Sequence, residues 1–418
     1  MASTRFRFRR TADFTALRLG RAVLGYLALI TSIITMAPFR LQWTPAHGVS
    51  GVWNWSDLVM NVLMFVPFGF VYQLTRPRGA PPDWPRVVVL GAMLSGTIET
   101  LQLFSPTRYT SLLDLATNTA GAALGAWLFA RVARRLEDDT AVQSLALELP
   151  LMGLVYQLIP LCWLIGLGSE GGTRRIFVLP IAACAGAILG TVHAAYLAPE
   201  RHQSRRWLVA MALGWVIVAV VPGALGDLDL ICAGALLTVG IALARSITIR
   251  RGLSTEANRR FELPTLRLVL PLFAVYVALS ALWPLSAPTP AWQWGVALTP
   301  LQIEPTQSGM YRLLEHVAAF TLIGYMIAEV HGRDARALRD AAPRVAWWAG
   351  GISLALQAAR GWHPDAGASA LLWLFTVASA LFGGWMYLLQ RDHVRALVDR
   401  RRLLASLAAA KPVLARAS

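Results

Sequence analysis

The chain has 418 residues, of which 56% are hydrophobic and only 15% are charged. A typical globular protein is about 25% charged, so this chain has too little charged surface to keep a domain of its size dispersed in water. The composition excludes an ordinary soluble enzyme, a disordered regulator and a nucleic-acid-binding domain. The 16 Trp and 9 Tyr residues fit a bilayer protein, because these aromatic rings gather at membrane interfaces.

Apolar runs define the expected helices. A helix crosses a bilayer with about 20 apolar residues, and the sequence contains twelve such runs. They lie near residues 17–36, 57–75, 86–104, 111–130, 145–167, 175–197, 207–224, 228–245, 266–285, 311–330, 344–360 and 367–390. We therefore predict an all-α, polytopic transmembrane bundle of about twelve spans.

The net charge of +15 is almost entirely arginine, since Lys411 is the only lysine. Counting Lys and Arg in alternate segments between runs places 31 on the side of the N-terminus and five on the other side. By the positive-inside rule both termini are expected to be cytoplasmic. The basic stretch 391–418 carries spaced Leu and Val residues, which predicts a cytoplasmic helix on the membrane surface.

The first and last thirds of the apolar chain share sequence features. Asn61 to Gly69 resembles His316 to Gly324 in spacing, and Gln102 corresponds to Gln357. Eight spans separate the first and ninth runs, so the two copies are expected to be parallel. The predicted organisation is a four-span unit at 1–135, a middle four-span block at 136–260, a degenerate copy of the first unit at 261–390, and the tail.

Polar side chains are densest at the outer ends of the second, third and fourth runs. An ionisable group at membrane depth is costly and marks a candidate functional site. Because residues four apart share a helix face, and the third and fourth runs are joined by a short loop, the Glu99 and Asp114 faces are expected to converge on Arg108. The candidate substrate-binding residues are Asp57, Asn61, Glu99, Gln102, Arg108, Asp114 and Asn118.

Two structural roles compete with ligand binding. Asp114 stands in the first turn of its helix, where a carboxylate caps the helix. The whole set could also be a polar latch that fixes three helices together. Gly121 and Gly125 have GxxxG spacing, which predicts close packing of that helix.

The ordered pattern from Asp57 to Trp127 resembles the VanZ-like family of bacterial membrane proteins. It comprises Asp57, Asn61, Pro67 and Gly69, then Glu99, Gln102 and Arg108, then Asp114, Asn118, Gly121 and Gly125. The resemblance implies a bacterial inner-membrane protein of the cell envelope. The family takes its name from resistance to the glycopeptide teicoplanin, which acts on lipid-linked cell-wall precursors, so such lipids are the implied partners.

Three functions fit the sequence. The first is a non-enzymatic envelope protein that binds or shields a lipid-linked headgroup at the outer leaflet. The alternative is a multi-span transporter or flippase, which the repeat favours. An intramembrane enzyme using Glu99 and Asp114 ranks last, because no Ser/His/Asp set, HExxH or metal motif accompanies them. We expect no cofactor, no metal and no nucleic-acid partner.

Overall fold

The computed structural model describes residues 20–46, 48–49, 54–76, 83–137, 150–169, 172–196, 203–252, 262–294, 306–331, 337–364 and 367–415. Within these residues the chain is helical, with two isolated β-bridges. In the described residues each of the twelve apolar runs overlaps a helix, and the run at 207–224 is divided between two helices on either side of Val220. Six helices are long and apolar enough to cross a membrane, and two apolar helices are shorter. A polytopic helical protein is thus supported, whereas the count of twelve spans stays a prediction.

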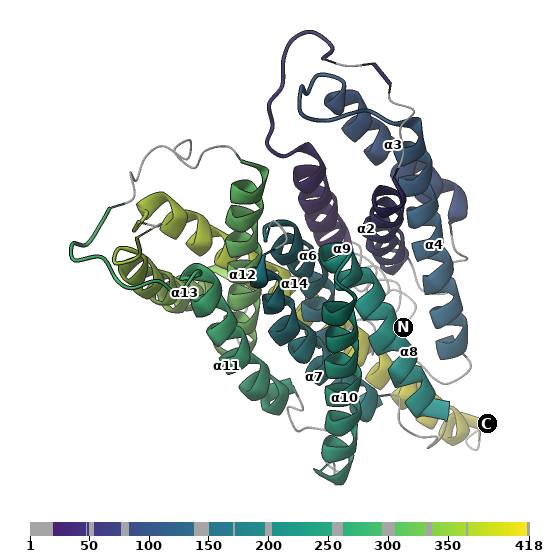
Figure 1. The fold of residues 1–418 in the computed structure, drawn as a ribbon. Helices are drawn as coiled ribbons and strands as arrows, with labels where there is room; N and C mark the ends of the chain where they lie inside the picture. Colours follow the sequence, from purple (N-terminus) through teal and green to yellow (C-terminus); the bar gives the residue numbers. More distant parts are fainter. Residues whose placement is uncertain are drawn as a thin grey trace.

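The helices form three bundles that follow one another along the chain (Figure 1). The first contains an N-terminal helix, Gly20–Met36, with α2 (Trp55–Leu74), α3 (Trp84–Gln102) and α4 (Leu112–Glu137). The middle bundle contains α6 (Pro150–Leu167), the 3₁₀ helix η1 (Thr173–Phe177), α7 (Val178–Tyr196), α8 (Gln203–Ala219), α9 (Val221–Ala224) and α10 (Leu228–Gly252). The last contains α11 (Glu262–Ala281), α12 (Gln307–His331), α13 (Leu338–Arg360) and α14 (Ala370–Ala415).

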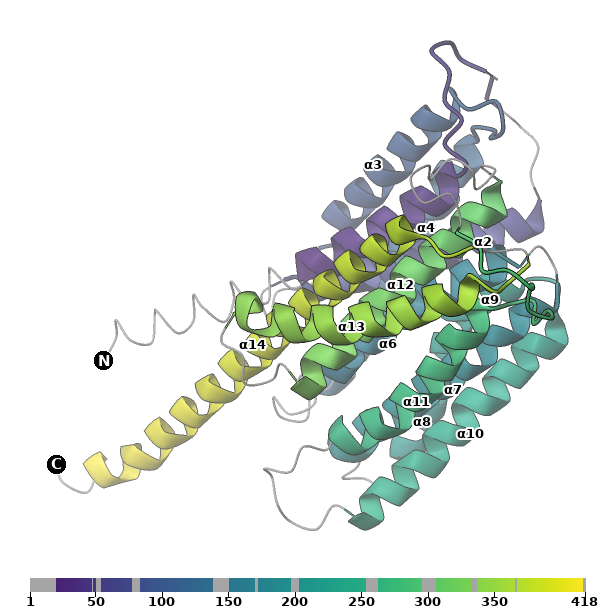
Figure 2. The same ribbon diagram turned by 90° about the vertical axis from the view of Figure 1, so that its left-hand side faces the viewer.

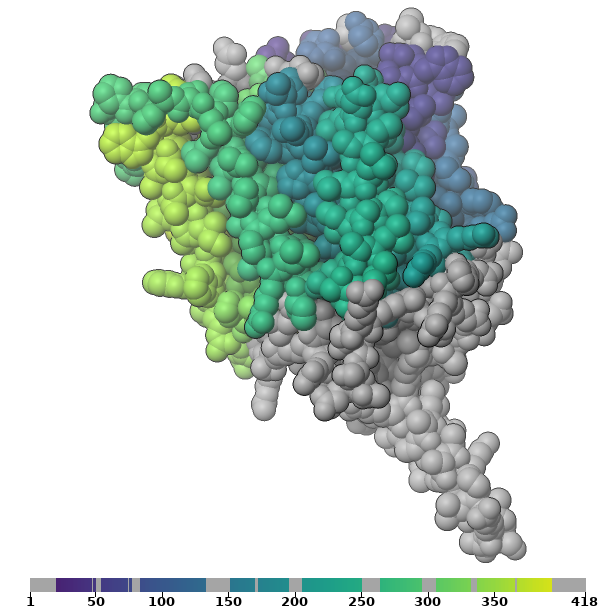
Figure 3. Space-filling model, turned by 60° about the horizontal axis from the view of Figure 1, so that its bottom comes forward, coloured from purple at the N-terminus to yellow at the C-terminus, as the bar shows by residue number. Residues whose placement is uncertain are grey.

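The core lies where the middle and last bundles meet. The segment Thr173–Ala194 of the middle bundle is 83% buried and α12 of the last bundle is 72% buried, whereas the other candidate spans are at most 44% buried. Within α6, Trp163 and its apolar neighbours are fully buried against α7 and α12. The space-filling view shows the first and last bundles on either side of the middle one (Figure 3).

Glycines allow α2 and α4 to pack closely. A Cβ on Gly121 would overlap the carbonyl of Val62, and one on Gly125 would overlap the carbonyl of Val66. Because glycine has no side chain, the two backbones can approach to this distance. The packing role predicted for Gly121 and Gly125 is therefore confirmed.

The C-terminal tail differs from the prediction. The helix α14 runs without a break for 46 residues, from Ala370 to Ala415. At 1.5 Å per residue it is about 69 Å long, so it extends well beyond its neighbours (Figure 2). Residues 391–415 of the tail therefore continue α14 and are not a separate surface helix. Its Leu, Ala and Arg residues favour helix, and within the described residues no glycine interrupts α14 after Gly384. The basic N-terminal segment lies outside the described residues.

The first and last bundles repeat several backbone contacts. The loop after the first helix of each bundle donates two hydrogen bonds to the end of the third. These are Gln42 N to Phe104 O (2.8 Å) and Ala46 N to Leu103 O (2.7 Å) in the first, and Thr289 N to Trp362 O (2.9 Å) and Gln293 N to Gly361 O (2.7 Å) in the last. Parallel bridges join Val49 to Thr110 and Trp294 to Ala368.

The close packing of α2 on α4 also has a counterpart between α12 and α14. A Cβ on Gly383 of α14 would overlap the carbonyl of Thr321 in α12, as one on Gly125 overlaps that of Val66. In the reverse direction, Gly69 faces the carbonyl of Ala122 and Gly324 faces that of Ala380. Each bundle thus packs its second helix on its fourth through small residues.

Candidate functional site

Glu99 fastens the start of α4 to the end of α3. Its Oε2 accepts a hydrogen bond from the backbone N–H of Ser111 (2.8 Å), and its carbonyl accepts one from the Thr110 hydroxyl (3.0 Å). The first N–H groups of a helix have no partner within the helix, so this carboxylate caps α4. In the last bundle Oε1 of Gln357 accepts from the N–H of Ser369 (2.9 Å) in the same way.

Arg108 does not lie between the two carboxylates, and this part of the prediction is wrong. Its Nε donates to the carbonyl of Ala37 (3.2 Å), and its Nη2 donates to the carbonyls of Ala37 (3.1 Å) and Ile34 (3.2 Å). Within the described residues it forms no ion pair with Glu99 or Asp114. The reason is that the last carbonyls of the Gly20–Met36 helix lack donors and carry partial negative charge, which attracts the guanidinium.

The same arginine links the first bundle to the last. Its Nη2 donates to the hydroxyl of Tyr311 in α12 (3.2 Å), and that hydroxyl donates to the carbonyl of Ile34 (2.9 Å). Gln307 also donates to the Tyr311 hydroxyl (2.6 Å). Local spacing does not identify Tyr311, because it lies 203 residues from Arg108 and 277 residues from Ile34.

Gln102 and Asn118 also form hydrogen bonds inside the first bundle. The Nε2 of Gln102 donates to the carbonyl of Thr35 (3.0 Å), and the Nδ2 of Asn118 donates to the Ser95 hydroxyl (2.9 Å). Both side chains are buried. These bonds hold α3 to the N-terminal helix and to α4.

The remaining polar side chains come together at the N-terminal ends of α2 and α4. Asp114 is half-buried, accepts a hydrogen bond from the side chain of Asn61, and interacts electrostatically with Asp57 and Glu99. Asp57 is exposed and Asn61 is half-buried. We call Asp57, Asn61 and Asp114 the acidic cluster. Both carboxylates lie in the first turn of a helix, where the helix dipole stabilises negative charge.

In the described residues the acidic cluster has no cationic partner. Its charged neighbour is the Glu99 carboxylate, which adds a further acceptor. Such a group of oxygen acceptors can bind an ammonium group or hydroxyl donors. In the described part of the chain no three His, Cys, Asp or Glu side chains are arranged to hold a metal ion.

A second polar site lies at the interface of the middle and last bundles. Glu315 of α12 forms a buried ion pair with Arg174 of η1 (2.7 Å). Its Oε1 accepts hydrogen bonds from the Tyr276 hydroxyl (2.8 Å) and the Ser280 hydroxyl (2.7 Å), and Arg174 donates to Ser280 (2.9 Å). Glu315 can be recognised in the sequence as a carboxylate within an apolar run. No sequence feature near it identifies Arg174 as its partner.

Composition, helices and sites together define a polytopic helical protein of membrane-spanning character. Residues 17–134, which form the first bundle, match the family model described as VanZ/LLP1. This segment of the chain is thus VanZ-like, and the resemblance seen from Asp57 to Trp127 is confirmed. No curated relative and no solved structure matches the chain.

Proposed function

We propose that the acidic cluster binds the polar headgroup of a lipid-linked cell-envelope molecule at the outer leaflet, through an ammonium group on that headgroup. The single observation that carries this proposal is the grouping of Asp57, Asn61 and Asp114 with no arginine paired to them in the part of the chain that the structure describes. Neighbouring carboxylates repel each other unless a cation or hydrogen-bond donors compensate them.

The other four candidate residues support this site in the proposal. Glu99, Gln102, Arg108 and Asn118 bond to backbone or side-chain groups of the first bundle, so they fix the N-terminal helix, α3 and α4 in place. Their role in a ligand site is then to position the acidic cluster, and direct contact with the headgroup falls to Asp57, Asn61 and Asp114.

The proposed setting follows from the arginine distribution and the VanZ-like domain. Both termini are cytoplasmic, the protein lies in the bacterial inner membrane, and the N-terminal ends of α2 and α4 face outward. A lipid-linked cell-wall precursor or another envelope lipid would be bound or shielded there. Tolerance of teicoplanin is the phenotype that such shielding would produce.

Native mass spectrometry of the protein with its co-purifying lipids tests this proposal. Wild type is expected to retain an amine-bearing envelope lipid that the Asp57→Asn/Asp114→Asn variant loses. Asp229→Asn is the matched control, because Asp229 also lies in the first turn of a predicted outward-starting helix, α10, and is exposed. Equal lipid retention by all three folded proteins would refute the proposal.

A second candidate function is transport or flipping of an envelope lipid. The observation that favours it is the set of matching contacts in the first and last bundles, which supports the proposal that 1–135 and 261–390 are parallel copies in a twelve-span chain. Transporters place binding sites between such copies. Movement of a labelled aminophospholipid in reconstituted vesicles, lost in Glu315→Gln, would favour this function over static binding.

A further inference from the structure

A groove lies between the first bundle and the middle bundle, away from the acidic cluster. Its volume is about 410 Å³, within the range of about 300–1,000 Å³ typical of small-molecule sites. Its walls come from the Gly20–Met36 helix, α2, α4, α6, α7 and α8. The lining is almost entirely aliphatic and aromatic, with Arg131 of α4 as its one charged side chain.

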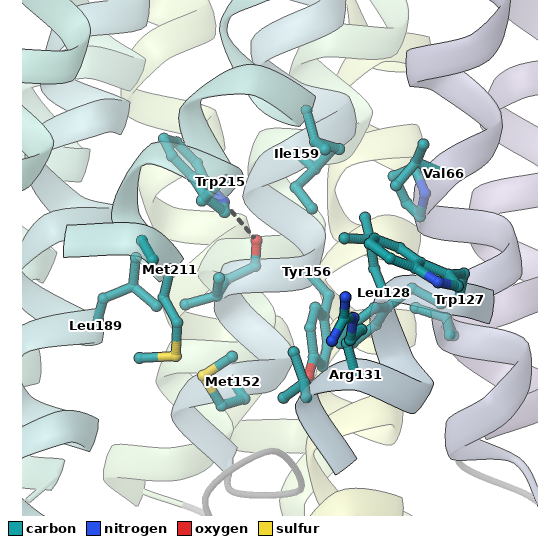
Figure 4. Close-up of a pocket in the computed structure, with 18 of the residues that line it drawn as sticks. Val66, Trp127, Leu128, Arg131, Met152, Tyr156, Ile159, Leu189, Met211 and Trp215 are labelled. Atoms are coloured by element: carbon teal, nitrogen blue, oxygen red, sulfur yellow. Dashed lines mark hydrogen bonds between the residues drawn. The ribbon is translucent and has the colours of Figure 1, made fainter. Parts of the chain in front are cut away.

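The groove is open on the side of α4 and α8. Trp127 is 41% exposed although it lines the groove, and Gly214 of α8 is exposed, with no atom within 4 Å of where a Cβ would be. A hydrogen bond joins α8 to α6 at the deep wall, where the indole N–H of Trp215 donates to the carbonyl of Val155 (3.3 Å; Figure 4). In a bilayer such an opening meets lipid chains.

The groove extends along α8, and its charged end lies at one end of the helices. Arg131 lies near the end of α4 and Trp207 near the start of α8, while other lining residues reach as far as Val218. The arginine count assigns the Arg131 end of the groove to the cytoplasmic leaflet, whose surface is rich in anionic lipids. Arg205 and Arg206, both exposed, begin α8 at the same end.

Arg131 is placed to meet an anion at the groove. Its guanidinium lies over the Trp127 ring at 5.2 Å from the centroid, and Figure 4 shows it beside Tyr156. The side chain is exposed, and within the described residues its N–H donors have no acceptor. A guanidinium that stacks on an aromatic ring keeps its donor edge available for a phosphate.

We propose that this groove binds one acyl chain of an anionic phospholipid of the cytoplasmic leaflet, with the lipid phosphate on Arg131. The apolar walls exclude a polar ligand, and the single cation at the membrane surface selects a negatively charged headgroup. The bound lipid fills the space between the VanZ-like bundle and the middle bundle and so stabilises their contact. This site is independent of the outer acidic cluster.

The test uses the full chain in nanodiscs of phosphatidylcholine with or without phosphatidylglycerol carrying the same acyl chains. Wild type is expected to retain phosphatidylglycerol preferentially in native mass spectrometry. Arg131→Gln should lower that preference about fivefold, since one arginine near the surface contributes about 1 kcal/mol toward anionic lipid. Arg267→Gln, an exposed arginine at the start of α11, is the matched control and should keep the preference.

A second variant tests the apolar part of the groove. Gly214→Leu places an apolar side chain in the groove at a position where a Cβ meets no atom within 4 Å, and it should abolish retention of either lipid at this site. Gly240→Leu on α10, where a Cβ likewise meets nothing within 4 Å, is its control. If Arg131→Gln behaves like Arg267→Gln, or Gly214→Leu like Gly240→Leu, the proposal is wrong.

A third test uses only the wild-type chain, so its result does not depend on whether a variant folds. Phosphatidylglycerol with a photoreactive acyl chain should crosslink to residues of the groove such as Met152 and Met211. Crosslinks spread evenly over the lipid-facing helices, with none enriched in the groove, would overturn the proposal. The Asp57→Asn/Asp114→Asn variant should show the same groove crosslinks as wild type, which separates this site from the proposed outer site.

Discussion

The first and last bundles share a scaffold but treat their carboxylates in opposite ways. In the last bundle Glu315 is fully enclosed, paired with Arg174 and bonded to Tyr276 and Ser280. In the first bundle Asp57 and Asp114 lie at the surface end of their helices, and the nearby Arg108 is bonded elsewhere. The comparison teaches that one bundle uses its charge to hold the protein together, while the other leaves acceptors available to a ligand.

The largest expected effect comes from breaking the enclosed pair. Arg174→Leu leaves the Glu315 carboxylate buried without its cation and should lower the free energy of unfolding by about 3–5 kcal/mol. Chemical unfolding in detergent measures this change. The double variant Arg174→Leu/Glu315→Leu should recover much of the loss, and a single variant as stable as wild type would contradict the structural role of this pair.

The shared scaffold predicts parallel effects of glycine substitutions in the two bundles. Gly125→Leu and Gly383→Leu each push a side chain into the backbone of the facing helix, and each should destabilise the protein by about 1–3 kcal/mol. Gly351→Leu on α13, where a Cβ meets nothing within 4 Å, is the control. A cost in only one bundle would break the proposed equivalence of α2–α4 and α12–α14 packing.

The helix-capping contacts predict a graded response at Glu99. Glu99→Ala leaves the buried N–H of Ser111 without its acceptor and should cost about 1–3 kcal/mol. Glu99→Gln keeps an oxygen acceptor, as Gln357 does for Ser369, and should cost less than about 1 kcal/mol. Thermal unfolding compares the two variants. Equal costs would mean that the charge of Glu99, rather than its hydrogen bond, stabilises α4.

The smallest effect on stability is expected in the acidic cluster itself. Asp57→Asn/Asp114→Asn removes two carboxylates that repel each other and lie at least partly exposed. The free energy of unfolding should change by no more than about 0.5 kcal/mol. A loss above about 2 kcal/mol in unfolding experiments would instead identify the cluster as a structural latch.

Much of the helical organisation follows from local sequence. Apolar runs predict helices because each run satisfies its own backbone in lipid, and in the described residues all twelve overlap helices. Residues four apart share a face, which places Asp57 with Asn61 and brings Asp114 beside them once Gly121 and Gly125 let the helices approach.

The hydrogen-bond and ion-pair partners of individual side chains depend on how each helix is rotated and on residues far away in the sequence. The four-residue spacing predicts Asn118 on the same face as Asp114, but Asn118 donates to Ser95 of α3 because that side of α4 packs on α3. Arg108 binds the end of a helix about 70 residues earlier, and Glu315 pairs with Arg174 of another bundle. No local spacing encodes these contacts.

The most direct test of the acidic cluster is zero-length coupling in native membranes. A water-soluble carbodiimide joins a carboxylate to a primary amine that touches it, with the lost oxygen transferred to the carbodiimide. Peptide mass spectrometry should then find a lipid headgroup attached at Asp57 or Asp114, with little at the control Asp229. Equal coupling at Asp229, or none at Asp57 and Asp114, would contradict the proposal that these carboxylates hold an amine-bearing headgroup.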